Sequence, residues 1–186
     1  MKNPFLIGNK IYLRLISIED AAFLSQGEND PAVREALFLA FPSSASQAEE
    51  KIRQYSNSRE AIVLTIVEKD TDRLVGQTAF FRLDYVSRAA VFYLAILAPS
   101  FWSLGYGSEA TQLMVDYAFA TLNLNRIQLH VCAENTPAIK IYQRVGFVQE
   151  GILRQAMFRN GNYVDFWVMG MLRSDWLARR GHVAKD

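Results

Sequence analysis

Residues 99–110 join two segments of different periodicity. Their sequence is Pro-Ser-Phe-Trp-Ser-Leu-Gly-Tyr-Gly-Ser-Glu-Ala. The apolar run 90–98 before them is typical of a buried strand, and residues 109–122 after them have the pattern of a helix. A turn of this kind leaves backbone N–H groups at the helix start without partners, and such a helix start commonly binds an anion. Gly105 and Gly107 let a ligand approach the main chain because glycine has no Cβ. The segment therefore predicts a site for a phosphate-bearing molecule.

The composition indicates a single soluble domain. A chain of 186 residues with 51% hydrophobic residues can bury a full core. Its 20 basic and 19 acidic side chains nearly cancel, which argues against nucleic acid or a membrane surface as a partner. The single cysteine, Cys132, excludes an internal disulfide and fits a reducing compartment. We see neither a signal-like N-terminus nor an apolar stretch near the roughly 20 residues that span a bilayer, and expect a cytoplasmic protein.

The order of elements predicts a mixed sheet. Helical patterns follow the first strand, a meander comes next, and strands then alternate with helices. Asn160-Gly161 is the strongest short signal for a hairpin turn. We expect strands at 11–15, 61–68, 74–83, 88–98, 126–132, 147–158 and 163–172, and helices at 17–25, 31–37, 48–55, 109–122 and 136–145. Capping patterns begin the first three helices at Ser17, Asp30 and Ser46.

Residues 105–110 also match G-x-G-x-x-A, the dinucleotide-binding fingerprint, with Glu134 as the acid that would bind the ribose. Several features disfavour this interpretation. The glycines lie in mid-chain, six residues separate them from the preceding strand, and too little chain follows for a second mononucleotide-binding half. A further alternative is that the two glycines belong to an ordinary strand–helix loop.

Residues 133–147 are the second informative segment. Thr136 as N-cap before a proline predicts a helix start, and Gly146 predicts its end. With that start, the Asn135 side chain lies just outside the helix and is free to contact another group. Spacing alone favours a core position for the Tyr142 ring, with its hydroxyl satisfied. One face of the helix carries Ala138, Ile141, Tyr142 and Val145.

Here the chain resembles a known family. Asn135, Ala138-Ile139, Tyr142 and Gly146-Phe147 are similar to the N-x-x-A-I-x-x-Y-x-x-x-G-F signature of the GNAT family of N-acetyltransferases. Residues 102–107 lie where that family has its R/Q-x-x-G-x-G/A pyrophosphate loop. Further matches resemble the branch of ribosomal-protein N-terminal acetyltransferases and their small-amine relatives; they lie at 8–14, 30–34, 150–154 and 158–161, with Asp165 and Trp176.

The resemblance runs over residues 8–177, which we expect to form one N-acetyltransferase domain before a short tail, 178–186. It implies the α+β GNAT fold, with a mixed, mostly antiparallel sheet of about seven strands flanked by about four helices. Two parallel strands of that sheet splay apart. Carried over, the splay lies between the strand that ends at Ala98 and the strand 126–132.

The resemblance also implies acetyl-CoA as cosubstrate and no metal. N–H groups of the loop would hold the CoA pyrophosphate. Backbone groups near Ala95 and Leu97 would pair with the amides of the pantetheine arm, and Asn135 would contact the arm from the other side. The residues expected to bind the donor are Ala95, Leu97, Trp102, Ser103, Leu104, Gly105, Tyr106, Gly107, Ser108, Asn135 and Ala138.

Tyr142 is the catalytic residue that the resemblance implies. A neutral amine attacks the thioester directly, and the tetrahedral intermediate expels the CoA thiolate. A phenol of pKa ~10 is suited to hydrogen-bond a thiolate whose conjugate acid has a pKa near ~8.5. Cys132 is expected to be a small core residue, since this reaction needs no acyl-enzyme.

Several positions depart from the family's pattern. Ser103 and Leu104 replace a common glycine and lysine of the loop, so phosphate binding should rely more on main-chain amides than on a side-chain cation. Leu39 and Ala40 stand where polyamine acetyltransferases place an acidic pair. Val91 stands where many relatives carry a glutamate that acts as general base.

Without that glutamate, Glu35, Asp84 and His130 are alternative bases, although a partly buried structural role is favoured for His130. A lysine-like amine of pKa ~10.4 is about 0.1% neutral at pH 7.5, whereas an α-amine near ~7.8 is about a third neutral. The difference corresponds to roughly 3 kcal/mol of deprotonation. A weakly basic amine therefore suits a site that lacks a dedicated base.

The sequence thus predicts an N-acetyltransferase that acts on a primary amine, either a protein N-terminus or a small molecule. The acceptor would be bound by the first two helices and the hairpin 158–164, and the protein would be a monomer or homodimer. Two alternatives belong to other classes. A non-catalytic acyl-CoA-binding module would bind acetyl-CoA without forming product, and a nicotinamide-dependent oxidoreductase would bind NAD but not CoA.

Overall fold

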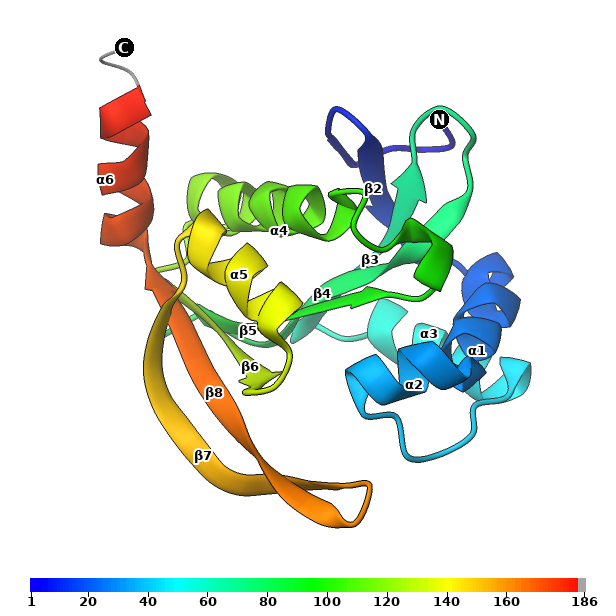
Figure 1. Cartoon of the computed structure of the whole chain (residues 1–186). Coiled ribbons are helices and arrows are strands. Elements are labelled where there is room, and N and C mark those ends of the chain that lie inside the picture. The colour runs from blue at the N-terminus through cyan, green and yellow to red at the C-terminus, as the bar shows by residue number, and fades with distance from the viewer. Residues whose placement is uncertain (184–186) are drawn as a thin grey trace. The chain divides into compact units, whose positions relative to one another are not determined.

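The structure, a computed structural model, describes residues 1–183, so the end of the expected tail, 184–186, lies outside the described residues. Figure 1 labels the main elements. In chain order they are β1 (Leu6–Ile7), β2 (Ile11–Leu15), α1 (Ala21–Asn29), α2 (Pro31–Leu37), α3 (Ala45–Ser56), β3 (Ala61–Glu68), β4 (Leu74–Asp84), β5 (Ala89–Ile96), α4 (Tyr106–Asp116), β6 (Arg126–Cys132), α5 (Thr136–Val145), β7 (Val148–Arg159), β8 (Asn162–Leu172) and α6 (Arg173–Val183).

The strands hydrogen-bond in the order β1-β2-β3-β4-β5-β6-β8-β7, and β5 pairs with β6 in parallel. This confirms the predicted α+β fold with a mixed sheet. The described residues contain eight strands instead of about seven, because β1 is a two-residue strand that pairs with β2 and is too short to show alternation. They contain six α-helices instead of about four, and α6 takes in residues that were expected to begin the tail.

Close contacts divide the chain into two compact units. The first consists of Met1–Phe81 and Tyr93–Leu113, and the second consists of Arg82–Phe92 and the described residues from Met114 onward. The two ends of β5 therefore belong to different units, and so do the two ends of α4.

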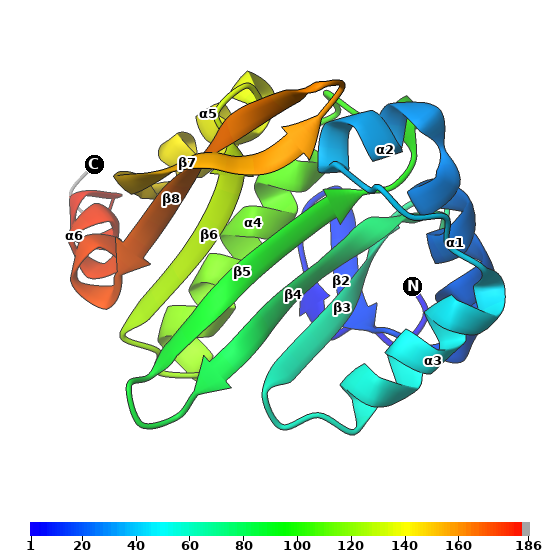
Figure 2. The same ribbon diagram turned by 90° about the horizontal axis from the view of Figure 1, so that it is seen from below.

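In the first unit, helices pack on strands around one apolar core. Figure 2 shows α1, α2 and α3 grouped together. Gly27 of α1 makes a close approach to the end of β5, since a Cβ there would lie 2.7 Å from the Leu97 carbonyl oxygen. The buried members of the core are Ile16, Ala21, Leu24, Val33, Ala48, Ile52, Val63, Ala79, Ala95 and Leu97.

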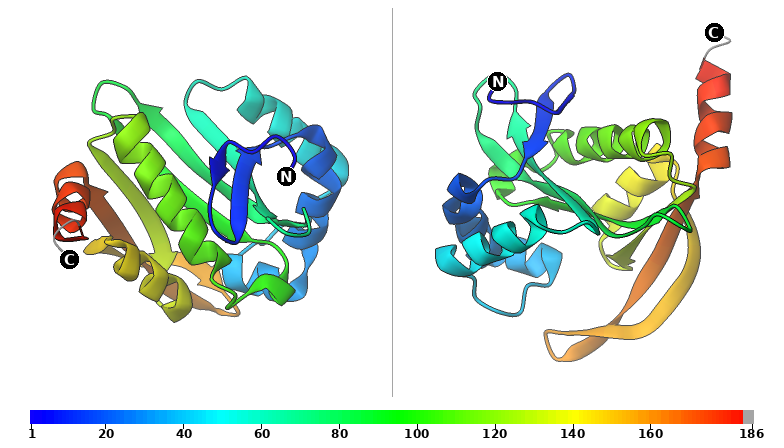
Figure 3. Two further views of the ribbon diagram at one scale, coloured as in Figure 1. Left: turned by 90° about the horizontal axis from the view of Figure 1, so that it is seen from above. Right: turned by 180° about the vertical axis from the view of Figure 1, so that it is seen from behind.

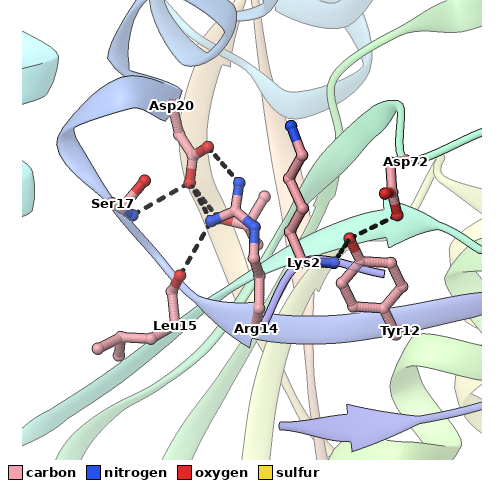
Figure 4. A network of polar contacts seen from close by, with 8 residues as sticks. Lys2, Tyr12, Arg14, Leu15, Ser17, Asp20 and Asp72 are labelled. Atoms are coloured by element: carbon pink, nitrogen blue, oxygen red, sulfur yellow. Dashed lines mark hydrogen bonds and ion pairs between the residues drawn. The ribbon is translucent and has the colours of Figure 1, made fainter. Parts of the chain in front are cut away.

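A buried ion pair joins β2 to the start of α1 (Figure 4). Arg14 donates two hydrogen bonds to the Asp20 carboxylate, at 2.5 and 2.9 Å. The Thr65 hydroxyl and the Ser17 N–H donate to the same carboxylate at 2.7 and 3.1 Å. Burial alone would raise the pKa of Asp20, but the hydrogen bonds from Arg14, Thr65 and Ser17 hold it below its usual value. The charged pair therefore fixes the chain where it passes from sheet to helix.

The helix starts of the first unit follow capping patterns. The Asp30 carboxylate accepts the N–H groups of Ala32 and Val33, as predicted for the start of α2. The prediction for α3 is wrong, because its cap is Ser44 and not Ser46. Ser44 and Gln47 form a capping box of their own, and this earlier box lengthens the helix at its start.

In the second unit, β6, β8 and β7 form antiparallel ladders. The parallel ladder between β5 and β6 runs only from Ala89↔Arg126 to Val91↔Gln128, and both strands continue past it. The predicted hairpin turn is confirmed: Asn160 and Gly161 have φ values of 47° and 84°, the pair that a type I′ turn requires. Figure 1 shows the long hairpin of β7 and β8 that this turn closes.

The helix expected at 109–122 begins earlier, at Tyr106, and passes into a π-helical turn at Tyr117–Thr121. Within the second unit, Trp176 of α6 packs on Phe119 of this turn, with ring centroids 5.8 Å apart. The Trp176 indole N–H also donates to Asp116 at 2.7 Å. The early start places residues 106–108 in the first turn of α4.

Candidate functional site

In the first unit, a 3₁₀ turn at Pro99–Phe101 leads from β5 into the loop before α4. The Gly105 carbonyl accepts the Glu109 N–H at 3.0 Å and so begins the helix. The N–H groups of Tyr106, Gly107 and Ser108 therefore open the first turn, where a helix offers them no acceptor. The arrangement presents adjacent backbone donors and the positive end of the helix dipole to an anion.

Two residues of the loop adopt positive φ, Ser103 at 62° and Gly105 at 90°. Glycine adopts this region freely, whereas a residue with a Cβ is strained there by roughly 1 kcal/mol. The family pattern favours glycine at both positions. Ser103 therefore keeps the conformation that this pattern requires and is strained by it.

The aromatic side chains of the loop fix its path. The Trp102 indole N–H donates to the Ile96 carbonyl oxygen at 3.2 Å. The Tyr106 ring is buried against Phe101, and its hydroxyl donates to the Glu68 carboxylate. That hydrogen bond raises the pKa of the Tyr106 hydroxyl. The Tyr106 side chain is thus engaged by Glu68, and the backbone N–H of Tyr106 remains in the first turn of α4.

The loop also has a cationic neighbour that the motif does not contain. The Lys10 ammonium, from the turn between β1 and β2, donates to the Leu104 carbonyl oxygen at 3.0 Å. Leu104 itself is 45% exposed and carries no charge. Lys10 and Leu104 are 94 residues apart, so no local pattern in the sequence indicates this contact.

The backbone at the end of β5 is expected to pair with the pantetheine arm. The Leu97 N–H already donates to the Val75 carbonyl oxygen at 3.0 Å, and Ala95 and Leu97 are both buried in the core. Successive residues of a strand direct their backbone groups to alternate edges. The backbone groups of Leu94 and Ile96 therefore point away from β4, and the Ile96 carbonyl oxygen accepts the Trp102 indole N–H. Pairing of the arm near Ala95 and Leu97 stays a prediction.

In the second unit, α5 begins one residue earlier than expected. Asn135 and not Thr136 is the N-cap, and its side-chain oxygen accepts the Ala138 N–H at 3.2 Å. The prediction was wrong because asparagine caps at least as well as threonine, and Pro137 is tolerated throughout the first turn. The Asn135 oxygen is therefore not free, and its amide NH₂ is the part of the side chain left to donate to a ligand.

Tyr142 lies on the buried face of α5. The face is centred on Ile139, Tyr142 and Val145, whereas Ala138 and Ile141 are only half-buried. The Tyr142 ring is 8% exposed and makes edge contacts with Phe92 and Phe147, at centroid distances of 6.2 and 5.9 Å. These two aromatic contacts hold the phenol in one orientation. The helix ends at Gly146, as predicted, with φ 125°.

Val91 lies in register with Gln128 in the parallel ladder of the second unit. His130 is exposed, on the face of β6 opposite to its buried neighbours, so the expected partly buried role is wrong. Asp84 accepts the N–H groups of Val86 and Ser87, and the hydrogen bonds from Ser87 lower the pKa of Asp84. Asp84 thus stabilises the turn after β4.

Cys132 is buried with a free thiol, as expected of a core residue. Among residues 1–183, the structure contains no cluster of three or more His, Cys, Asp or Glu side chains that could hold a metal ion. None of the helices in this part of the chain is both long enough and apolar enough to pass through a membrane.

Comparison with known proteins identifies the family. Residues 10–148 match the model of the acetyltransferase (GNAT) domain. The chain is 33% identical to an uncharacterized N-acetyltransferase, p20, of Bacillus licheniformis over 92% of this chain and 97% of that protein. It is 30% identical to the putative ribosomal N-acetyltransferase YdaF of Bacillus subtilis, over 91% of this chain and 95% of that one.

A solved structure with the same fold is that of spermidine N-acetyltransferase from Vibrio cholerae in complex with CoA and spermine. It superposes with a TM-score of 0.84 at 28% identity, over 91% of this chain and 99% of that chain. These matches exclude the dinucleotide-binding interpretation of residues 105–110. The chain belongs to the GNAT family and is an N-acetyltransferase with acetyl-CoA as cosubstrate.

Proposed function

We propose that this N-acetyltransferase transfers the acetyl group of acetyl-CoA to a primary amine of low basicity, either a protein N-terminal α-amine or a weakly basic small-molecule amine. The observation that carries the proposal is Val91. It occupies the β5 position where many relatives carry a glutamate that acts as general base. Its neighbour across the ladder, Gln128, cannot accept a proton at neutral pH. An acceptor that is already partly neutral needs no such base.

Donor binding is supported by the loop of the first unit. Its backbone N–H groups at 106–108 suit the CoA pyrophosphate. The backbone groups of Leu94 and Ile96 suit the amides of the pantetheine arm, as in the addition of a strand to a sheet edge. The side chains of Trp102 and Tyr106 hold the loop in shape.

Tyr142 is the proposed acid. The lone pair of the neutral amine attacks the thioester carbonyl carbon, so that a C–N bond forms and the C–S bond breaks. The departing sulfur takes the Tyr142 phenol proton, and the proton released by the amine nitrogen passes to water. The products are the amide and CoA thiol, and water restores the phenol. The aromatic contacts with Phe92 and Phe147 support this role because they fix the ring.

The helices α1–α3 are the proposed acceptor side, and their charges do not favour a polycation. Glu28 pairs with Lys51 at 3.6 Å, Glu49 pairs with Arg53 at 3.1 Å, and Asp30 caps α2. Apolar residues, Leu39 and Ala40, stand at the acidic pair of the polyamine enzymes. Relatives named spermidine N(1)-acetyltransferase occur at 30% identity, so a polyamine is the acceptor class to test against.

The test is a CoA-release assay at pH 7.5 with purified protein. Acceptors are a set of short peptides with free N-termini, the same peptides with blocked N-termini, spermidine and an aminoglycoside. We expect kcat/KM for the preferred free peptide or aminoglycoside to exceed that for spermidine at least ~10-fold, in line with the neutral fractions of the amines. A preference for spermidine contradicts the proposal. Stabilisation by acetyl-CoA without product from any acceptor favours the non-catalytic alternative.

A homodimer fits the exposed apolar side chains of the β7–β8 hairpin. Ile152, Leu153, Phe158 and Tyr163 are each more than 40% exposed. Burial of such residues between two copies would remove apolar surface from water. Sedimentation of the wild type beside a Phe158→Ser variant tests this, because only a dimer through the hairpin is weakened by the change.

A further inference from the structure

The turn between β1 and β2 is fastened to the first turn of α4. The Glu109 carboxylate accepts the backbone N–H groups of Asn9 and Lys10, the latter at 3.1 and 3.2 Å. Gly8 leaves room for this contact, because a Cβ there would lie 2.1 Å from a Glu109 carboxylate oxygen. Figure 3 shows β1 and β2 beside the start of α4. The turn is thus held against the loop by a side chain of the helix itself.

This fastening directs the Lys10 side chain to the loop. Its ammonium lies 3.0 Å from the Leu104 carbonyl oxygen, and a Cβ built on Gly105 would lie 3.7 Å from the same nitrogen. An ammonium has three N–H donors, and Leu104 uses one of them. Lys10 forms no ion pair with any carboxylate in the described range 1–183. Its charge therefore lacks a counter-ion beside the loop that presents N–H donors.

We propose that Lys10 is a donor-binding residue whose ammonium contacts the pyrophosphate of acetyl-CoA at residues 102–108. The proposal rests on the proposed function of that loop. Leu104 stands where a lysine is common in the loop of the family. In this chain the corresponding positive charge would come from a different element, the turn between β1 and β2.

A consequence concerns Glu109, which acts as a positioning residue. Its carboxylate lies in the first turn of α4, where it interacts favourably with the helix dipole, yet it binds main-chain N–H groups and not the Lys10 ammonium. An ion pair between the two side chains would cancel the charge that the phosphate needs. Loss of the Glu109 carboxylate should therefore weaken donor binding, and the effect should disappear in a Lys10 variant.

The test compares dissociation constants, by titration calorimetry, for CoA, dephospho-CoA and pantetheine. Lys10→Met removes the charge and keeps most of the stem, and Lys10→Arg keeps the charge. Lys69→Met is the matched control, because the Lys69 ammonium binds the Gly8 carbonyl oxygen of the same turn at 3.0 Å. We expect Lys10→Met to weaken CoA and dephospho-CoA about 10-fold, the loss of one charge-assisted hydrogen bond. Lys10→Arg and Lys69→Met should stay within about 3-fold.

Pantetheine, which has no phosphate, should bind wild type and Lys10→Met equally. Equal CoA affinity in Lys10→Met and wild type overturns the proposal, as does a loss seen with CoA but not with dephospho-CoA, which places Lys10 at the 3′-phosphate. Wild type that binds no CoA would instead count against the proposed function. A double variant with Glu109→Gln supplies the second check: Glu109→Gln should weaken CoA binding in wild type and leave Lys10→Met unchanged.

Discussion

Two regions of the first unit differ in whether their charged side chains are paired. At the loop before α4, backbone N–H groups open the helix, and the Lys10 ammonium contacts the Leu104 carbonyl oxygen and forms no ion pair among the described residues. On the helices α1–α3, carboxylates such as Glu28 and Glu49 are paired with basic side chains. This difference supports the proposal that the acceptor is not a polycation, whereas the anionic donor meets backbone N–H groups and an unpaired ammonium.

The loop before α4 and Tyr142 differ in the kind of group that is expected to act: backbone N–H groups in the loop, and a side-chain hydroxyl in Tyr142. The loop tolerates Ser103 and Leu104 because its donors are backbone groups, whose positions depend on φ more than on side-chain identity. Tyr142, the proposed acid, has no such substitute, since its single phenol oxygen would donate the proton. Changes to the two kinds of group should therefore differ in size and in the kinetic constant that they affect.

Tyr142→Phe should have the largest effect. It removes the phenol proton and keeps the ring contacts with Phe92 and Phe147. We expect kcat to fall about 100-fold or more, the usual worth of a positioned acid, with CoA affinity changed less than about 2-fold. Tyr163→Phe, on the exposed hairpin, is the control. Unchanged turnover in Tyr142→Phe would remove this residue from the mechanism.

Asp20→Asn tests how the acceptor side is held in place. The change leaves the Arg14 guanidinium, whose side chain is only 15% exposed, without its carboxylate, so the free energy of unfolding at pH 7 should fall by about 2 kcal/mol. The pKa of Asp20 is lower in the folded protein than in the unfolded chain. The stability contributed by its ionisation is present above about pH 4 and is lost as the pH falls through the folded pKa.

The difference between wild type and Asp20→Asn, measured by urea unfolding, should therefore shrink below about pH 4. Asp70→Asn, at an exposed turn position, should stay within about 0.5 kcal/mol of wild type. A difference that is the same at pH 7 and pH 3.5 would show that the Asp20 charge does not contribute.

A smaller effect should follow when the acceptor side is given the missing charge. Leu39→Glu with Ala40→Glu restores an acidic pair, and kcat/KM for spermidine should rise several-fold through KM, most at low salt. Leu39→Gln with Ala40→Gln is the matched polar control. An equal gain for a peptide acceptor would mean that the pair does not select polycations.

Ser103→Gly should have the smallest effect. Glycine relieves the strain of a φ of 62°, but it also gains freedom in the unfolded chain, and the two terms oppose each other. We expect the free energy of unfolding to change by less than about 0.5 kcal/mol and the KM for acetyl-CoA to stay within about 2-fold. A large loss of donor affinity would show that the Ser103 hydroxyl, and not the main chain, binds the donor.

The elements with strong local signals were predictable from the sequence. The hairpin at Asn160-Gly161 and the helix end at Gly146 follow from positive φ values that few residue types adopt. The cap at Asp30 follows from its carboxylate, which accepts backbone N–H groups of the first turn. The start of α3 was not, because Ser44 and Ser46 both fit a capping pattern and only the complete helix decides between them. The two-residue β1 is too short to carry any periodicity.

Features that depend on distant residues were not predictable. The contact of Lys10 with Leu104 joins positions 94 residues apart, and the parity of the β5 backbone depends on where Val75 of β4 pairs. The exposure of His130 depends on which face of β6 is covered. The motifs could thus be predicted from local sequence. The charged and exposed groups around them could be found only from the tertiary structure.

We propose that the acceptor is a weakly basic amine that reacts without an enzymic base. The pH dependence of kcat/KM tests this most directly. The measurement is kcat/KM from pH 5.5 to 9.5 for two acceptors whose amines differ by about one pKa unit. We expect an inflection whose pH moves by the same one unit, because the fraction of neutral acceptor sets the rate. An inflection that stays at the same pH for both acceptors, and that disappears in His130→Gln, would contradict the proposal.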